Sequence, residues 1–204
     1  MQRSAGILLP VSSLPSPYGI GCFSQEAYDF VDWLKEAGQT YWQILPLGVT
    51  SYGDSPYQSF SAFAGNPYFI DYRLLADVGL LTADEVPAAR PVGPIDYGAL
   101  YNERPVILKK AADRLLAAPS PAYEAFCEAQ SFWLEDYTLF MAVKAEQGQA
   151  GLADWPDDLR CRKPEAIAAA KQRLAGAVDY YKAVQFFFYT QWNALKAYAN
   201  GKGV

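Results

Sequence analysis

Two short apolar segments separated by one amphipathic helix open the chain, and they restrict its fold more than any other feature. Ala5 to Val11 is a continuous apolar run of strand length, and Thr40 to Leu47 is a second segment rich in β-forming residues. Between them, Ser24 can cap a helix that Gly38 would end. A β-α-β unit with short joints is parallel by strong preference, and a continuous apolar run suits a strand covered on both faces. The sequence therefore predicts an α/β fold that starts as a doubly wound sheet or a (β/α)8 barrel starts.

A long segment without helical periodicity follows the second predicted strand. Thr50 to Asp71 is rich in Ser, Gly, Pro, Tyr and Phe, which predicts a long loop at the carboxyl end of that strand. Ligands bind at this end of the strands in barrels and open α/β sheets. Aromatic rings separated by hydroxyl and carboxylate groups suit a sugar, because its C–H faces stack on rings while its hydroxyls need directional partners. Composition alone leaves open the alternative of a loop packed as core beneath a helical subdomain.

The middle and the end of the chain are predicted to be mainly helical. Apolar spacing predicts a helix from about Val106 to near Pro119, a longer one from about Ala122 to Gln147, and a last one from about Ala177 to Asn200 with Gly201 as its C-cap. Two strands cannot close a barrel, so a barrel would be incomplete in this chain. We predict a partial barrel domain in 1–50 and 179–204, and an inserted loop and helical subdomain in 51–178.

Composition excludes several classes of function. The net charge of −5 argues against a nucleic-acid surface, and the absence of histidine excludes Ser-His-Asp or Cys-His catalysis within the chain. The three cysteines lack metal-ligand spacing and fit reduced thiols in the cytosol better than a disulfide framework. No apolar stretch reaches the roughly 18 residues that a membrane span needs. We therefore expect a cytoplasmic protein without a metal, a membrane span or a nucleic-acid partner, and its oligomeric state stays open.

Several motifs, in order along the chain, resemble the opening of the 4-alpha-glucanotransferase (amylomaltase) family. These motifs are Gly6–Pro10, Ser12–Ser16, Tyr18–Gly21, Trp42–Gly48 and, above all, Gly53–Tyr68. The match is strong over the first 75 residues or so, and Gln185–Ala199 again resembles the helix that precedes the family's third barrel strand. A match of this length is far more specific than a motif of four residues.

The resemblance implies the first two strands of a (β/α)8 TIM barrel with a mainly helical inserted subdomain, whose 51–178 segment includes a glucan-groove loop. It implies transfer of a segment of an α-1,4-glucan (maltodextrin) to the 4-hydroxyl of an acceptor by retaining double displacement, without a metal or organic cofactor. The family's nucleophilic Asp, its acid/base Glu and a further Asp follow later barrel strands. No catalytic residue is therefore assigned here, and the chain alone is expected to be inactive.

The resemblance also implies three substrate-binding residues. Ser55 and Tyr57 match family positions that line the donor–acceptor groove, and Tyr52 matches an aromatic residue associated with glucan binding. Each of the three has a purely structural alternative. Two other interpretations of the whole chain stay open, namely a noncatalytic maltodextrin-binding or interaction module, and a truncated gene product with uncovered strand edges.

Overall fold

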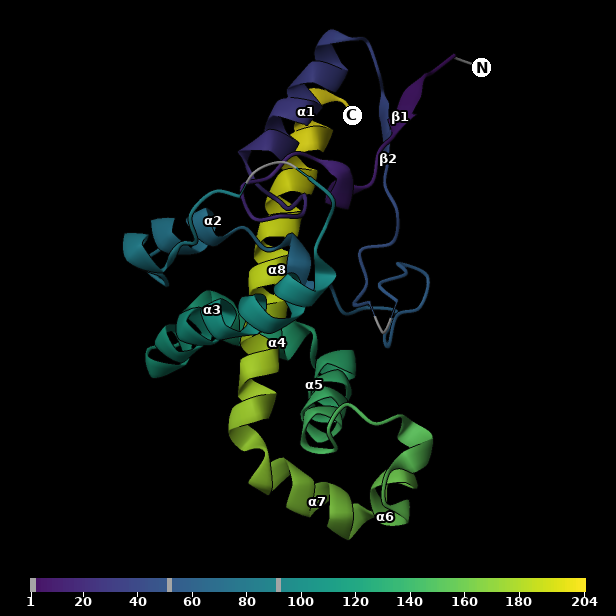
Figure 1. Cartoon of the computed structure of the whole chain (residues 1–204), viewed down its shortest axis with the longest axis vertical. Helices are drawn as coiled ribbons and strands as arrows, with labels where there is room; N and C mark the ends of the chain where they lie inside the picture. Colours follow the sequence, from purple (N-terminus) through teal and green to yellow (C-terminus); the bar gives the residue numbers. More distant parts are fainter. Residues whose placement is uncertain (1–2, 51–52, 91–92) are drawn as a thin grey trace. The chain divides into compact units, whose positions relative to one another are not determined.

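Parallel pairing of two short strands is the starting point of the fold. The computed structural model describes residues 3–50, 53–90 and 93–204. β1 (Gly6–Leu8) and β2 (Tyr41–Gln43) run side by side (Figure 1) and pair in parallel, with Gly6 opposite Tyr41 and Leu8 opposite Gln43. A Cβ atom on Gly6 would lie 2.5 Å from the Tyr41 carbonyl oxygen, so this close approach requires glycine. The predicted parallel β-α-β start is confirmed.

The helix between the strands follows the predicted pattern. α1 (Gln25–Glu36) has Ser24 at its N-cap in extended conformation, and Gly38 follows it with a φ of +69°. Its buried residues, Ala27, Val31 and Leu34, recur at a spacing of three and four. Such a spacing places them on one face of the helix, which packs into the core.

The strands are shorter and more exposed than predicted. Leu8 is 56% exposed and Tyr41 63% exposed, so the prediction of a strand buried on both faces is wrong for the part of the chain described here. β1 ends at Leu8, and Pro10 precedes the 3-10 helix η1 (Val11–Ser13). The physical reason for the exposure is that β1 and β2 pair only with each other among the described residues.

The remaining elements are mostly helices. In chain order they are η2 (Pro67–Phe69), α2 (Tyr72–Asp77), η3 (Ala83–Glu85), α3 (Tyr97–Ala117), α4 (Pro121–Ala129), α5 (Ser131–Glu146), η4 (Leu152–Asp154), α6 (Asp157–Arg160), α7 (Pro164–Arg173) and α8 (Ala175–Lys202). No helix of the described residues is both long and apolar enough to cross a membrane.

Contacts divide the chain into two compact units. The first comprises Met1–Arg114 and Phe187–Val204, and the second comprises Leu115–Phe186. These units are defined by contacts alone, and the functional division into 1–50 with 179–204 and 51–178 stays a prediction.

The core of the first unit contains packed aromatic rings and a glutamine side chain that bonds to a buried backbone position. The Phe23 ring lies 5.2 Å from the Phe188 ring and 5.6 Å from the Trp192 ring, centroid to centroid. Gln191 of α8 accepts a hydrogen bond from the Asp71 backbone N–H at 2.7 Å and donates one to the Asp71 carbonyl at 2.9 Å. Both backbone groups of a buried position are thus satisfied by a residue 120 positions away.

The second unit has its own apolar core. Its buried cluster consists of Leu139, Ala142, Val143, Trp155, Ala170 and Val178. The Phe140 and Trp155 rings stack at 5.2 Å, and Trp155 Nε1 donates to the Ala150 carbonyl at 3.2 Å. This contact ties the turn after α5 to the rest of the unit.

Two predicted helices have different bounds in the structure. α3 begins at Tyr97 rather than near Val106, because the Asp96 carboxylate accepts a hydrogen bond from the Ala99 N–H at 2.9 Å and caps an earlier first turn. The single helix predicted from Ala122 to Gln147 is two helices that meet at Gln130. The Gln130 side chain accepts a hydrogen bond from Trp133 Nε1 at 2.7 Å, and its backbone φ of −100° departs from helical values.

The last helix extends past its predicted C-cap. Gly201 lies inside α8, and Gly203, with a φ of +85°, is the glycine that takes the left-handed conformation. Lys202 pairs with Asp32 of α1 at 2.8 Å and lies 4.9 Å from the centre of the Tyr198 ring. These contacts hold the final turn against α1 (Figure 1), so the helix continues past the first of the two glycines.

Candidate functional site

A hollow of about 320 Å³ lies at the carboxyl ends of the two strands, within the first compact unit. The segments that follow β1 and β2 form part of its wall, and the predicted loop and the start of α3 form the rest. Its lining residues are Pro10, Val11, Ser12, Ser13, Ile20, Leu45, Pro46, Leu47, Gly48, Thr50, Asp54, Pro56, Asn66, Tyr68, Phe69, Ile95 and Tyr97. Apolar walls with a few hydroxyl, amide and carboxylate groups are typical of a small-molecule site.

Two contacts close the loop around this hollow. Gly48 and Gly65 form an isolated antiparallel bridge, and the Asn66 N–H donates to the Leu47 carbonyl at 2.8 Å. A Cβ on Gly65 would lie 2.2 Å from ring atoms of Phe188, so the loop packs directly against α8. The far end of the loop is therefore joined both to the segment after β2 and to the core.

A pair of tyrosines forms an aromatic wall of the hollow. The rings of Tyr68 and Tyr97 lie 6.2 Å apart at an angle of 46°. Burial raises the pKa of Tyr68 to about 12, so its hydroxyl stays protonated at neutral pH and can both donate and accept hydrogen bonds. The two rings offer apolar faces, and the hydroxyl offers a directional partner.

Asp54 places a carboxylate in the same hollow. Desolvation by burial raises the pKa of Asp54, and the nearby Thr50 side chain acts in the opposite direction. Its backbone has a φ of +54°, in the left-handed region that residues other than glycine rarely adopt. Asp54 thus adopts a left-handed backbone conformation, and its side chain lines the hollow.

The buried guanidinium group of Arg104 binds the last part of the loop, which contains η2. Arg104 of α3 is fully buried, and its Nη1 donates to the carbonyls of Pro67 at 3.1 Å and Ile70 at 2.9 Å. Its charged carbon also lies 4.8 Å from the centre of the Tyr72 ring. Hydrogen bonds from a charged group and a cation–π contact thus hold η2 in place behind Tyr68.

The predicted site residues lie at the rim rather than in the wall. Ser55 is half-buried, and its Oγ accepts a hydrogen bond from the Tyr57 N–H at 3.4 Å. Tyr57 is 72% exposed. Their chain neighbours Asp54 and Pro56 line the hollow, so the structure brings Ser55 and Tyr57 together at its edge. Tyr52 lies outside the described residues.

The sequence patterns did not predict the two tyrosines that form the aromatic wall of the hollow, Tyr68 and Tyr97, as site residues. Tyr68 was part of the quoted motif without such a role, and Tyr97 was not singled out. The signal for Tyr97 was present, because Asp96 can cap a helix and the following residue is then held at a helix start. Its distance to Tyr68 depends on a pairing across 29 positions, which no local pattern reports.

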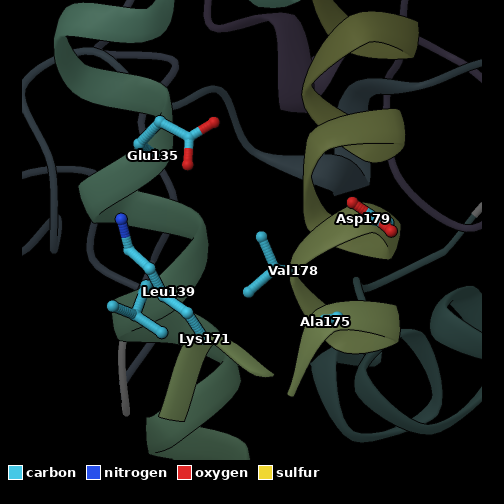
Figure 2. A pocket seen from close by; sticks show the side chains of 6 residues that line it. All are labelled: Glu135, Leu139, Lys171, Ala175, Val178 and Asp179. Atoms are coloured by element: carbon cyan, nitrogen blue, oxygen red, sulfur yellow. The ribbon is translucent and has the colours of Figure 1, made fainter. Parts of the chain in front are cut away.

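A second hollow lies within the other compact unit. Its volume is about 190 Å³, and Figure 2 shows its lining residues, Glu135, Leu139, Lys171, Ala175, Val178 and Asp179. Glu135 already forms an ion pair with Lys182. The groups here are mostly aliphatic or charged and no aromatic ring lines the hollow, so the first hollow is the better candidate for a sugar.

Comparisons with known proteins match the chain along nearly its whole length. A family model described as 4-alpha-glucanotransferase matches residues 9–204. The 4-alpha-glucanotransferase of Thermus thermophilus is 48% identical over all of this chain and 41% of its own length, and that of Clostridium butyricum is 46% identical over 95% of this chain and 40% of its own. The chain thus spans about 40% of the length of these relatives.

Solved structures agree with this result. The amylomaltase from Streptococcus agalactiae in complex with acarbose superposes with a TM-score of 0.94 at 41% identity, over all of this chain and 42% of that one. The amylomaltase from Corynebacterium glutamicum superposes with a TM-score of 0.65 at 17% identity, over 98% of this chain and 29% of that one, which shows a shared fold.

The fold and the hollow define a class, namely an α/β protein whose parallel strands end at a hollow lined with aromatic rings and hydroxyl groups. The family match covers β2 and the loop that closes the hollow. The chain belongs to the 4-alpha-glucanotransferase family.

Proposed function

We propose that the protein containing this chain is a 4-α-glucanotransferase, which transfers a segment of an α-1,4-glucan to the 4-hydroxyl of an acceptor. The observation that carries the proposal is the hollow at the carboxyl ends of β1 and β2, with Ser55 and Tyr57 at its rim. The similarity to an amylomaltase solved with acarbose supports an α-glucan as the ligand. In this proposal β1 and β2 are the first two strands of a (β/α)8 barrel, since ligands bind at this end of barrel strands.

The proposed role of this chain is to hold the glucan. The exposed Tyr57 ring offers a flat apolar face to a sugar ring, and the Ser55 hydroxyl offers a hydrogen-bond partner. Tyr52 is proposed as a third contact. The chemical step is proposed to be a retaining double displacement, in which one carboxylate forms a glycosyl-enzyme and a second carboxyl group acts as acid and then as base.

No residue of this chain is proposed as the nucleophile or the acid/base. From the resemblance to the family, those carboxylates are expected to follow later barrel strands. Transfer exceeds hydrolysis only if the acceptor replaces water at the glycosyl-enzyme, so a loop that covers the sugar contributes to the outcome. Residues 53–66 are proposed as part of that cover, because they close over the hollow and are joined to the core at Gly65.

The test is product analysis of the full-length protein with maltotriose, comparing Tyr57→Ala with the wild type. The wild type is expected to form glucose and longer maltodextrins. Loss of one stacked ring is expected to raise KM for maltotriose about 2- to 10-fold. Val78→Ala, which alters a residue 68% exposed at the end of α2, is the control. Hydrolysis products alone, or no products, would contradict the transferase assignment.

A noncatalytic maltodextrin-binding role is the second candidate. It is favoured by one observation, namely that every residue lining the hollow belongs to the first compact unit. Calorimetric titration of the 204-residue chain with maltoheptaose is the test, and Tyr57→Ala should reduce the heat. A sample with a sharp thermal transition and no heat of binding would exclude this role.

We also infer a cytoplasmic location. The three cysteines, Cys22, Cys127 and Cys161, are all free thiols in the structure, and thiols persist in reducing compartments. Burial raises the pKa of Cys22 to about 11, so this thiol stays protonated and unreactive. Fractionation of cells that express the full-length protein is the direct test.

A further inference from the structure

Helix α3 is connected to both rings of the aromatic wall of the hollow. It carries Tyr97, whose ring lies 6.2 Å from that of Tyr68. Seven positions later it carries Arg104, which binds the segment that contains Tyr68. Seven residues make about two turns of an α-helix, so Tyr97 and Arg104 lie on the same face of α3, about 10 Å apart along its axis. One face of α3 therefore supplies one ring and binds the backbone that carries the other.

The hydrogen bonds of Arg104 lie on both sides of Tyr68 in the sequence. The Arg104 Nη1 atom donates to the Pro67 carbonyl at 3.1 Å and to the Ile70 carbonyl at 2.9 Å. The first carbonyl directly precedes Tyr68, and the second follows it by two positions. Because one nitrogen binds both carbonyls, η2 cannot move along α3 without losing at least one of these bonds.

The chain is fixed by other contacts before and after this segment. Before it, the Asn66 N–H donates to the Leu47 carbonyl at 2.8 Å. After it, Gln191 binds the backbone N–H and carbonyl of Asp71 at 2.7 and 2.9 Å. Loss of the Arg104 bonds is therefore expected to affect the short segment between these two contacts rather than the whole loop.

The stability of the core alone does not explain a guanidinium group at this position. Arg104 is 2% exposed, and its Nε and Nη2 atoms have no hydrogen-bond partner among the described residues. Its Cζ atom also lies 4.8 Å from the centre of the Tyr72 ring. Burial of a charged group is unfavourable, and apolar side chains of similar volume often replace buried charges without loss of stability. The two carbonyls that Arg104 binds are the better explanation for the residue.

We propose that Arg104 is a positioning residue of the sugar site. By binding the backbone on both sides of Tyr68, it fixes the distance between the Tyr68 and Tyr97 rings and so the shape of the aromatic wall that meets the glucan. Arg104 is not proposed to touch the ligand. The glucan in this statement rests on the proposed function, whereas the placement of the rings does not. The two parts are therefore tested by separate measurements.

The test uses three variants of the full-length protein. Arg104→Met keeps an unbranched side chain and removes the charge and the donors. Arg104→Lys keeps a charge and donors on a side chain that is one bond shorter. Arg114→Met is the matched control, because Arg114 lies on the same helix and its Nη1 also donates to a backbone carbonyl, that of Leu80 at 2.9 Å, outside the hollow.

The placement of the rings is measured without substrate, by 19F NMR of protein labelled with 3-fluorotyrosine. The signals of Tyr68 and Tyr97 are assigned with Tyr68→Phe and Tyr97→Phe. Arg104→Met is expected to shift or broaden both signals, and Arg104→Lys should change them less. Arg114→Met should leave them at their wild-type positions. Unchanged signals in Arg104→Met, or equal changes in Arg114→Met, would overturn the positioning role.

Maltotriose kinetics measure the consequence for the ligand. Arg104→Met is expected to raise KM about 3- to 10-fold, as a loss worth about one hydrogen bond predicts. Its kcat should stay within roughly twofold of the wild type, because the ring contacts move and the reacting groups do not. Arg114→Met should keep both values. Changed ring signals in Arg104→Met with an unchanged KM would refute the link to the ligand.

A double variant shows whether Arg104 acts through Tyr68. In the Tyr68→Ala background, Arg104→Met should raise KM no further, because the ring that it places is already absent. A further increase of the same size would contradict this route. If Arg104→Met does not fold, Arg104→Lys beside Arg114→Lys decides the question with the same measurements. A wild-type protein that neither transfers nor binds glucans would refute the proposed function, and the ring signals would still decide the positioning role.

Discussion

Bonds to Arg114 strongly lower the pKa of the Glu85 carboxyl group. Arg114 donates to both of its carboxylate oxygens, at 2.6 and 3.0 Å, and the Thr82 N–H donates to Oε2 at 3.0 Å. These bonds lower the pKa of Glu85 from 4.5 to about 2. One carboxylate thus joins the short helix η3 to α3 through two kinds of donor.

The lowered pKa predicts how stability depends on pH. Because the folded-state pKa is depressed, the stabilisation by ionised Glu85 is present above pH 4.5 and is lost as the pH falls toward 2. Glu85→Gln is therefore expected to have a lower Tm than the wild type at pH 7, and the two Tm values should converge near pH 2. Thermal unfolding followed by circular dichroism measures both.

The control for this prediction is Asp84→Asn, which removes an exposed charge one position away. It should leave the difference between pH 7 and pH 2 close to that of the wild type. If Glu85→Gln showed the same Tm as the wild type at pH 7, the pairing with Arg114 would contribute nothing to stability.

Two glycines, one in the loop and one near the end of α8, differ in whether their positions have space for a side chain. Gly65 has no space for a Cβ, since the Phe188 ring would lie 2.2 Å away. Gly201 lies within α8 with nothing within 4 Å of a Cβ. The first glycine permits a close approach between elements, whereas the second only lowers the intrinsic helix propensity.

Alanine substitutions should separate these two roles. Gly65→Ala is expected to lower the free energy of unfolding by about 1–3 kcal/mol, because the Phe188 ring must shift within a packed core. Gly201→Ala should raise it, by up to about 0.5–1 kcal/mol. Urea denaturation of both variants beside the wild type measures the changes. Equal midpoints for Gly65→Ala and the wild type would show that the loop does not pack against α8 as described.

The exposed pair of strands β1 and β2 is the part of the molecule that most favours association between chains. Leu8 is 56% exposed on β1, and Tyr41 is 63% exposed on β2. Strand edges with exposed apolar side chains favour association between chains. The 204-residue chain on its own should therefore associate as its concentration rises.

A lysine on the strand tests this expectation. Leu8→Lys should lower the average mass of the isolated chain in multi-angle light scattering, because a charge on an edge strand opposes pairing. Val78→Lys, at an exposed position directly after α2, should not. An isolated wild-type chain that stayed monomeric at all concentrations would show that the strand pair does not mediate association between chains.

Local signals along the sequence account for most of the architecture. The order of strand, helix and strand, the cap at Ser24 and the long loop all follow from residues that are neighbours in sequence. The ordered motifs around Ser55 and Tyr57 carry the family membership, and the family model supports it. Each of these features is set by propensity, periodicity or turn chemistry within about a dozen residues.

Only the tertiary structure decided the features that depend on distant partners. Gln191 satisfies the backbone of Asp71 across 120 positions, and Tyr97 meets Tyr68 in the wall of the hollow. The end of α8 is set by Lys202 and Asp32 rather than by the first available glycine. The physical reason is the same in each case, because a buried polar group or an aromatic ring takes the partner that the fold places beside it.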